Sequence, residues 1–212
     1  MGKIKQGILG GFSGKVGNVV GTSWKGIAVM KVLPLSVANP KTAAQTAQRG
    51  RMTNVVAYAT LILALYIKPL WDRFQTKKSG YNAFVSENIA EFDTALPETP
   101  SHMKLSTGKM AKTVFTCDAA AGDDNEPNVA WTNDAGSGYK LATDKAFILI
   151  INRTNGDFVL FGSQNTRVTA SASVTFANNM TAGDKLDCYL SFLRADGTVA
   201  SETAYLEHTV TA

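Results

Sequence analysis

The sequence has few of the residues that build most catalytic and metal sites. Its 212 residues include two histidines, His102 and His208, and two cysteines, Cys117 and Cys188. No CxxC pair is present and no histidine stands near a cysteine in the sequence, so the spacing of a zinc site is missing. The GxSxG turn that positions a nucleophilic serine is also missing. We therefore expect no enzyme activity, no cofactor and no bound metal.

Two short patterns imitate ligand-binding motifs without completing them. The glycine-rich stretch from Gly10 to Lys15 lacks the GxxxxGK[ST] spacing of a phosphate loop, and Val16 replaces the hydroxyl residue. The acidic run Asp123-Asp124-Asn125-Glu126 lacks the spacing of a calcium-binding EF-hand loop. We interpret this run as a solvated connection, and weak calcium binding is the alternative.

Long hydrophobic segments are also absent. The longest mostly apolar run, Val55 to Ile67, has 13 residues and ends at Lys68-Pro69, whereas a membrane span needs about 20 residues. Glycines interrupt the first 17 residues, where a secretory signal would need an apolar run. These features predict no membrane contact and no export signal. Cys117 and Cys188 are then expected to be reduced and buried, and a disulfide across a β-sandwich is the alternative.

Acidic residues are missing from the front of the chain, where the first is Asp72. Residues 1–113 contain 15 basic and 5 acidic residues, and residues 114–212 contain 6 basic and 12 acidic residues. Opposite charge on the two halves favours an acidic partner for the front half or head-to-tail contact between copies. Simple solvation of the basic residues is the alternative. Nucleic acid stays open as a partner, although no recognised binding motif accompanies the charge.

The N-terminal part predicts a β-ribbon followed by a helical hairpin. Residues 1–38 are too rich in glycine for a helix, and β-prone runs flank Lys25-Gly26 as in a hairpin. A lone two-stranded ribbon is marginal in water, so it should lie against another surface. Asn39-Pro40 favours a helix start, and this helix becomes apolar around most of its circumference towards Tyr66. In so small a module the covering surface is expected to include another chain. Ser79 is expected to cap a second helix over residues 80–92.

The C-terminal part predicts an all-β domain. Residues 95–111 contain prolines and lack periodicity, so we expect a linker between an assembly module at residues 1–94 and a sandwich at residues 112–212. Seven short strands fit an immunoglobulin or fibronectin type III-like β-sandwich. They are expected at residues 112–119, 128–132, 145–152, 157–163, 171–177, 185–193 and 199–209. The predicted fold class is α+β.

The strongest resemblance lies in residues 1–92. The stretch GILGGFSGKVGNVVGTSWKGIAVMKVLP, then NPKTAAQTAQRGRM and SGYNAFVSENI, resembles a family of uncharacterised Bacteroidota proteins and their phage relatives. It is also similar to small structural proteins of phage genomes. The resemblance implies a virion context, with assembly in a bacterial cytoplasm, and transfers no functional residue.

These observations lead to one principal functional prediction. We expect a non-enzymatic structural protein of a phage-type virion or related particle, such as a capsid-associated, decoration or tail component. Its partners would be further copies of itself or other virion proteins. The expected contact residues are Lys15, Val16, Val20, Trp24, Arg49 and Arg51. The alternatives are a nucleic-acid-binding protein that uses the basic half, and a sandwich module that binds a glycan or a protein.

Overall fold

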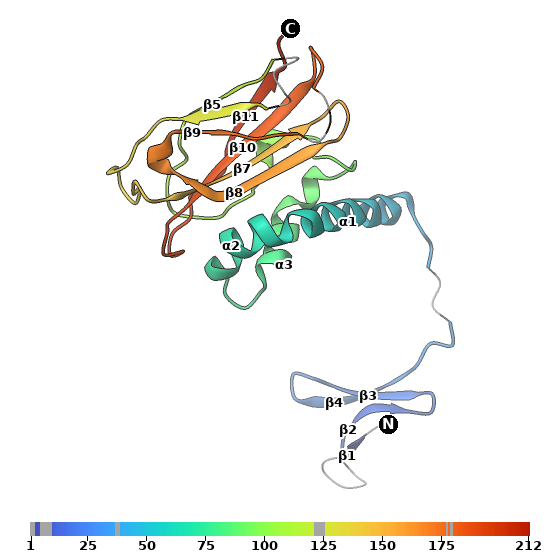
Figure 1. The fold of residues 1–212 in the computed structure, drawn as a ribbon. Coiled ribbons are helices and arrows are strands. Elements are labelled where there is room, and N and C mark those ends of the chain that lie inside the picture. Colours follow the sequence, from blue (N-terminus) through green and yellow to red (C-terminus); the bar gives the residue numbers. More distant parts are fainter. Residues whose placement is uncertain (1–2, 5–9, 37–38, 121–125, 177, 179) are drawn as a thin grey trace. The chain divides into compact units, whose positions relative to one another are not determined.

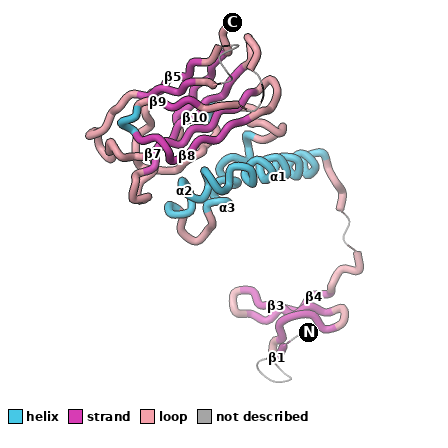
Figure 2. Tube along the Cα trace, viewed as in Figure 1, coloured by secondary structure: helices cyan, strands magenta, loops and turns pink. Residues whose placement is uncertain are grey.

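The computed structural model describes residues 3–4, 10–36, 39–120, 126–176, 178 and 180–212. The chain divides into two compact units, Met1–Thr42 and Ala43–Ala212. The smaller unit contains strands, whereas the larger one combines helices and strands, so the fold is mixed (Figures 1 and 2). Each unit is described by itself below.

The smaller unit is a four-stranded antiparallel sheet, which we call the N-terminal sheet. Its strands are β1 (Lys3–Ile4), β2 (Phe12–Val16), β3 (Val19–Trp24) and β4 (Ile27–Val32), and they lie side by side in sequence order. Strands β3 and β4 are joined by the two residues Lys25 and Gly26, whose φ angles are 48° and 85°. Two positive φ angles are typical of the type I′ turn, whose twist matches that of a β-hairpin.

The helices belong to the larger unit. Helix α1 (Ala43–Ile62) continues through a π-helical turn (Leu63–Ile67) into the short α2 (Lys68–Trp71). Pro69 lies at the start of α2 and has no N–H to donate to the preceding turn. The wider π-helical turn lies directly before it, where the regular hydrogen-bond pattern of the helix is interrupted. Helix α3 (Gly80–Asn88) is capped as its sequence predicts, because the Ser79 hydroxyl accepts a hydrogen bond of 3.2 Å from the backbone N–H of Asn82.

The rest of the larger unit is a β-sandwich, as the sequence predicts. Its seven strands are β5 (Phe115–Asp118), β6 (Asn128–Trp131), β7 (Lys145–Asn152), β8 (Phe158–Thr166), β9 (Ser171–Ser173), β10 (Lys185–Leu193) and β11 (Ala204–Thr209). One sheet has the order β5-β6-β9 and the other has the order β11-β10-β7-β8. The fourth strand, β8, pairs with the third strand rather than with the fifth. This three-on-four arrangement is that of a fibronectin type III-like sandwich.

Strands β7 and β10 are buried on both faces, and this position explains their nearly continuous apolar sequences. One face of the sheet, with Ile148 and Leu190, packs against the other sheet of the sandwich. The opposite face, with Leu149 and Tyr189, packs against the helices. Figure 1 shows the helices along one side of the sandwich. The larger unit therefore has three layers, a helical layer and two sheets.

This layering corrects two expectations from the sequence. One side of the apolar C-terminal part of the helical stretch is covered by the chain's own sandwich, because Tyr66 and Leu70 are fully buried in one core with Leu149 of β7. Leu61 and Leu65 of the same stretch stay 58% and 47% exposed, so this cover is partial. The helical stretch Ala43–Phe74 is long and apolar enough to cross a membrane by length and composition alone, and 39% of its most apolar window is buried in the structure.

The second correction concerns the expected linker at residues 95–111. The indole N–H of Trp71 donates to the carbonyl of Leu105 at 2.8 Å, and Lys104 and Asn88 exchange hydrogen bonds of 2.7 and 3.0 Å. Met103 and Leu105 are buried in the core shared by the helices and the sandwich. The segment is therefore part of the larger unit, and the chain divides at Thr42 instead of after residue 94.

Candidate assembly surface on the N-terminal sheet

The N-terminal sheet has two chemically different faces. Because directly paired residues of antiparallel strands point to the same face, the register assigns each side chain. Lys15 pairs with Val20 and Val20 pairs with Lys31, so these three form one cross-strand row. Val16, Val19 and Val32 form the next row on the opposite face. We call the first the lysine face and the second the apolar face.

The apolar face carries exposed hydrophobic side chains and no charged residue of β2, β3 or β4. Val16 and Val19 are exposed, Val32 is 75% exposed and Met30, in the adjacent row, is 71% exposed. Part of this face is covered by the chain itself, because the Phe12 ring lies close to Gly21. Large apolar side chains rarely gather on an exposed surface unless that surface binds something.

The lysine face combines cations with large apolar groups. Trp24 and Ile27 form a cross-strand pair on it, and they are 63% and 62% exposed. The ammonium group of Lys25 in the turn lies 5.0 Å from the centre of the Trp24 ring, within the range of a cation–π contact. This face is suited to an acidic or mixed surface, whereas the apolar face is suited to a dry contact.

The described residues of the N-terminal sheet form no hydrophobic core of their own. Among the described residues of its unit, Gly21 is the sole buried residue, and no large apolar side chain is buried. A sheet of this size needs a hydrophobic face packed against something to be stable in water. The N-terminal sheet therefore exposes apolar side chains of the kind that protein interfaces bury.

The predicted contact residues fall into two groups. Lys15, Val20 and Trp24 lie together on the lysine face of the N-terminal sheet, and Val16 lies on the apolar face. Arg49 and Arg51 lie in α1 of the other unit. Arg51 forms an ion pair with Asp93, and the hydrogen bond from Arg51 lowers the pKa of Asp93.

Strand β4 contributes exposed residues that the sequence interpretation omitted. They are Ile27, Val29, Met30 and Val32, and Leu35 follows beyond the strand. A usable signal was present in the sequence. Ile27–Val32 is a β-prone run with one charge and neither glycine nor proline, which is typical of a strand that pairs readily.

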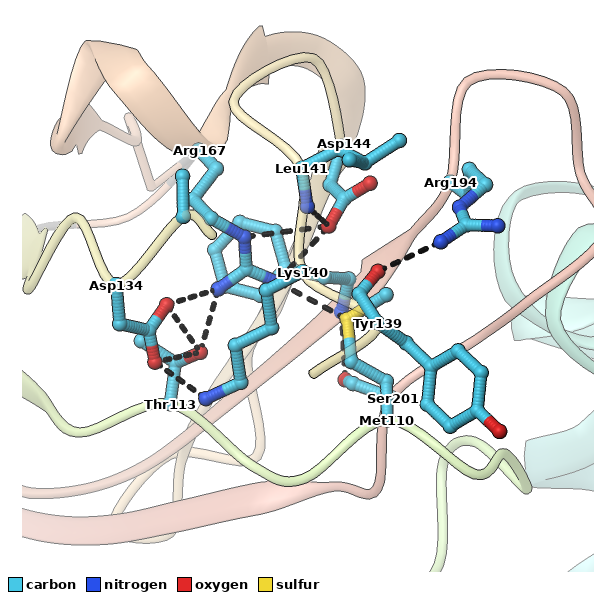
Figure 3. Close-up of polar contacts among 12 residues, drawn as sticks. Met110, Thr113, Asp134, Tyr139, Lys140, Leu141, Asp144, Arg167, Arg194 and Ser201 are labelled. Carbon is cyan, nitrogen blue, oxygen red and sulfur yellow. Dashed lines mark hydrogen bonds and ion pairs between the residues drawn. The ribbon is translucent and has the colours of Figure 1, made fainter. Parts of the chain in front are cut away.

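The larger unit contains a cluster of buried charges, shown in Figure 3. Arg167 is fully buried, and its guanidinium donates to Asp144 Oδ2 at 3.2 Å and to Thr113 Oγ1 at 2.7 Å. The same guanidinium forms an ion pair with Asp134, which also pairs with Lys140. Burial opposes the ionisation of Asp134, but the hydrogen bond from Lys140 and the charge of Arg167 outweigh it, and the pKa of Asp134 is lowered.

This cluster holds the end of the sandwich together. Besides the two carboxylates, the guanidinium of Arg167 contacts Met110 Sδ at 3.1 Å. The backbone carbonyl of Arg167 accepts a hydrogen bond of 3.0 Å from the indole N–H of Trp131. Every guanidinium nitrogen of Arg167 therefore has a partner within the chain. A group so fully engaged is suited to stabilising the fold rather than to binding a ligand.

Grooves in the larger unit are shallow and mixed in character. One of about 500 Å³ is lined by Phe74, Tyr139, Thr107 and Lys109 among others. No group of three or more histidine, cysteine, aspartate or glutamate residues in the described part of the chain is arranged to hold a metal ion. Cys117 and Cys188 are both buried and free.

Comparisons with known proteins give a family and a distant fold likeness. A family model described as "Family of unknown function (DUF6266)" matches residues 11–207. No curated protein matches the chain. Among solved structures, the chain is similar to the crystal structure of the chicken CNTN1 FN1–FN3 domains, with 9% identity and a TM-score of 0.33. That match covers 50% of this chain and 33% of that chain.

Proposed function

For a chain that belongs to the DUF6266 family of unknown function, we propose a non-enzymatic structural role in a phage-type virion or related particle. The chain would be a capsid-associated, decoration or tail component that assembles through its N-terminal sheet. The larger unit would then be the part that the assembled particle displays.

One observation carries this proposal. The N-terminal sheet buries none of its large apolar side chains among the described residues, and it exposes Val16, Trp24, Ile27, Met30 and Val32. Full burial of a valine or methionine side chain contributes roughly 1.5–3 kcal/mol. Several such side chains together can offset the roughly 4–15 kcal/mol that association costs in lost freedom. The same residues left in water would make the sheet marginal.

The assembly part of the proposal is tested by the mass of the full chain in solution. Light scattering after size exclusion should show a mass that rises with concentration above the 22.6 kDa of one chain. Val32→Asp, which places a charge on the apolar face, should lower that mass. Val114→Asp is the matched control, because Val114 is 77% exposed on the larger unit. A constant mass of one chain at every concentration would contradict the proposal.

The virion part of the proposal is supported by the resemblance of residues 1–92 to small structural proteins of phage genomes, and by the absence of a recognisable catalytic motif. It is tested by mass spectrometry and negative-stain imaging of particles purified from cells that carry the gene. The chain should be present in those particles at a fixed stoichiometry. Its consistent absence from them would argue against a virion role while leaving self-assembly untouched.

A second candidate function is nucleic-acid binding, and one observation favours it. Residues 1–42 contain six lysines and no acidic residue. Phosphate contacts release counterions, so binding of duplex or single-stranded DNA would fall steeply between about 50 and 200 mM salt. Titration of the full chain with labelled DNA at these two concentrations tests it. Absence of binding at the lower concentration would end this alternative.

A further inference from the structure

Strand β4 is the free edge of the N-terminal sheet, and its backbone groups can be assigned a direction. The sheet order places β4 outermost, with β3 as its neighbour on one side. Leu33 N–H donates to the Asn18 carbonyl at 2.7 Å, so Leu33 turns its backbone groups towards the hairpin partner. In an antiparallel pair this orientation alternates along the strand. Ala28, Met30 and Val32 therefore turn their N–H and C=O groups outward from the sheet.

This edge has little of the protection that natural sheets give their edges. Strand β4 forms six consecutive pairs with β3, from Val19–Val32 to Trp24–Ile27, without a register shift. Lys31 is its one charged residue, and the strand contains no proline or bulge. Pro34, the next outward position, has no N–H to donate. The free edge of β4 therefore offers three backbone N–H donors and three C=O acceptors, and the row of donors ends at Pro34.

Each of the other edges in the described part of the chain is short, covered or irregular. Strand β8 has a register shift opposite Lys145 and Phe147 and a positive φ of 60° at Ser163. The segments directly before and after β11 form bridges to neighbouring segments, at Ser201 and Thr211. The remaining edge strands, β1, β5 and β9, have two, four and three residues. The regular edge that two copies of the chain have in common is therefore β4.

We propose that two copies of this chain pair through their β4 strands, antiparallel and about a twofold axis at Met30, to form one continuous eight-stranded sheet. This inference rests on the proposed assembly function and names its partner. In this register Met30 faces Met30 of the second copy, and Ala28 faces Val32 of the second copy. All three outward-facing residues of each edge are then paired. A register centred on Val29 would instead place Val32 opposite Gly26, whose φ of 85° does not continue a strand.

The side chains fit the same register. A twofold axis normal to the sheet keeps each face on its own side, so the two apolar faces join into one uncharged surface around the paired Met30 side chains. Lys31 lies opposite Val29 of the second copy rather than opposite Lys31. The two Lys31 side chains stay on a diagonal of about 7–8 Å, which is close to the Debye length at physiological salt.

The charge makes the choice of partner testable. Both copies bring lysines and no acidic residue in residues 1–42, so added salt should screen their repulsion and strengthen the pairing. Binding to an acidic protein or to nucleic acid would weaken with salt instead. A rise in the paired fraction between about 50 and 500 mM salt is the result we expect, and a clear fall would contradict pairing of two copies.

Cysteine cross-linking of the full chain tests the register. Met30→Cys should give a covalent dimer under mild oxidation with diamide, because directly hydrogen-bonded residues lie about 5.5 Å apart between Cα atoms, within the reach of a disulfide. Val29→Cys is the matched control, because its two copies would lie on a diagonal at roughly 7–8 Å. The unsubstituted chain controls for Cys117 and Cys188, which are buried.

Each outcome decides something. A dimer with Met30→Cys and little with Val29→Cys supports the inference. The reverse result, or an oligomer by light scattering that neither variant traps, overturns the β4 contact while leaving the proposed assembly function standing. A chain that stays a monomer at every salt and protein concentration overturns both.

Discussion

The guanidinium carbon of Arg167 lies 3.9 Å from the centre of the Phe192 ring, so a buried cation is stacked on a buried aromatic ring. Its nitrogens pair with Asp144 and Asp134, and Asp144 is itself fully buried. Arg167→Met should lower the free energy of unfolding by about 3–5 kcal/mol, because it leaves a buried carboxylate without its partner. Urea unfolding measures this change.

The control for that variant is Lys104→Met. Lys104 pairs with Glu87 on the surface at 2.9 Å, and exposed ion pairs contribute roughly 0–1 kcal/mol. A loss of similar size in both variants would show that the buried cluster has no special role in stability.

The lowered pKa of Asp134 predicts a loss of stability in acid. Its pKa is lower in the folded chain than the value of about 3.9 in the unfolded chain, so the unfolded state takes up the proton first as the pH falls. The stabilisation is present above pH of about 4 and is lost as the pH falls through the folded-state pKa. Asp134→Asn should therefore be less stable than the unsubstituted chain at pH 7, and the difference should shrink towards pH 3. A difference that is constant from pH 7 to pH 3 would contradict this assignment.

The shared core of the larger unit predicts that the helices and the sandwich unfold together. Trp71 lies in the core between helices and sheet, and Trp131 lies between the two sheets. In a Trp24→Phe background, fluorescence and far-ultraviolet circular dichroism should give coincident urea transitions for the larger unit. An early loss of helical signal, before the sandwich unfolds, would show instead that the helices form a separate domain.

Gly21 predicts a specific requirement for glycine in the N-terminal sheet. A Cβ atom there would lie 2.2 Å from the Phe12 carbonyl oxygen and 2.6 Å from its ring. Gly21→Ala should therefore displace β2 and increase hydrogen exchange of the backbone amides in residues 12–32. Gly50→Ala in α1 is the control, since nothing lies within 4 Å of its Cβ position. Equal exchange in the two variants would contradict the packing of Phe12 over Gly21.

The sequence predicted the sandwich well because its strands are strongly patterned. Residues 145–152 and 185–193 were expected as strands, and they are β7 and β10 with the same bounds. The cap at Ser79 was also predictable, because its chemistry is local. Helix α1, in contrast, begins at Ala43 rather than at the predicted cap Asn39, and Lys41 between them has a positive φ of 46°.

What the sequence did not predict depends on contacts between distant segments. The apolar residues around the helix near Tyr66 predict that it packs against other surfaces, but they do not identify those surfaces. In the structure one of them is the chain's own sheet. Residues 95–111 have no periodic pattern in the sequence because they form irregular backbone. That backbone is held by contacts with distant residues, such as the hydrogen bond from Trp71 to Leu105. The exposed strand β4 could have been identified from its β-prone run with a single charge, but the direction of its backbone groups required the register.

The central claim is that contact with another chain completes the N-terminal sheet. Hydrogen–deuterium exchange of the peptide spanning residues 12–32, measured over a hundredfold range of protein concentration, tests it most directly. We expect rapid exchange in dilute solution and growing protection as the concentration rises, while β7 and β10 stay protected throughout. Strong and unchanging protection of residues 12–32 in a dilute monomer would contradict the account.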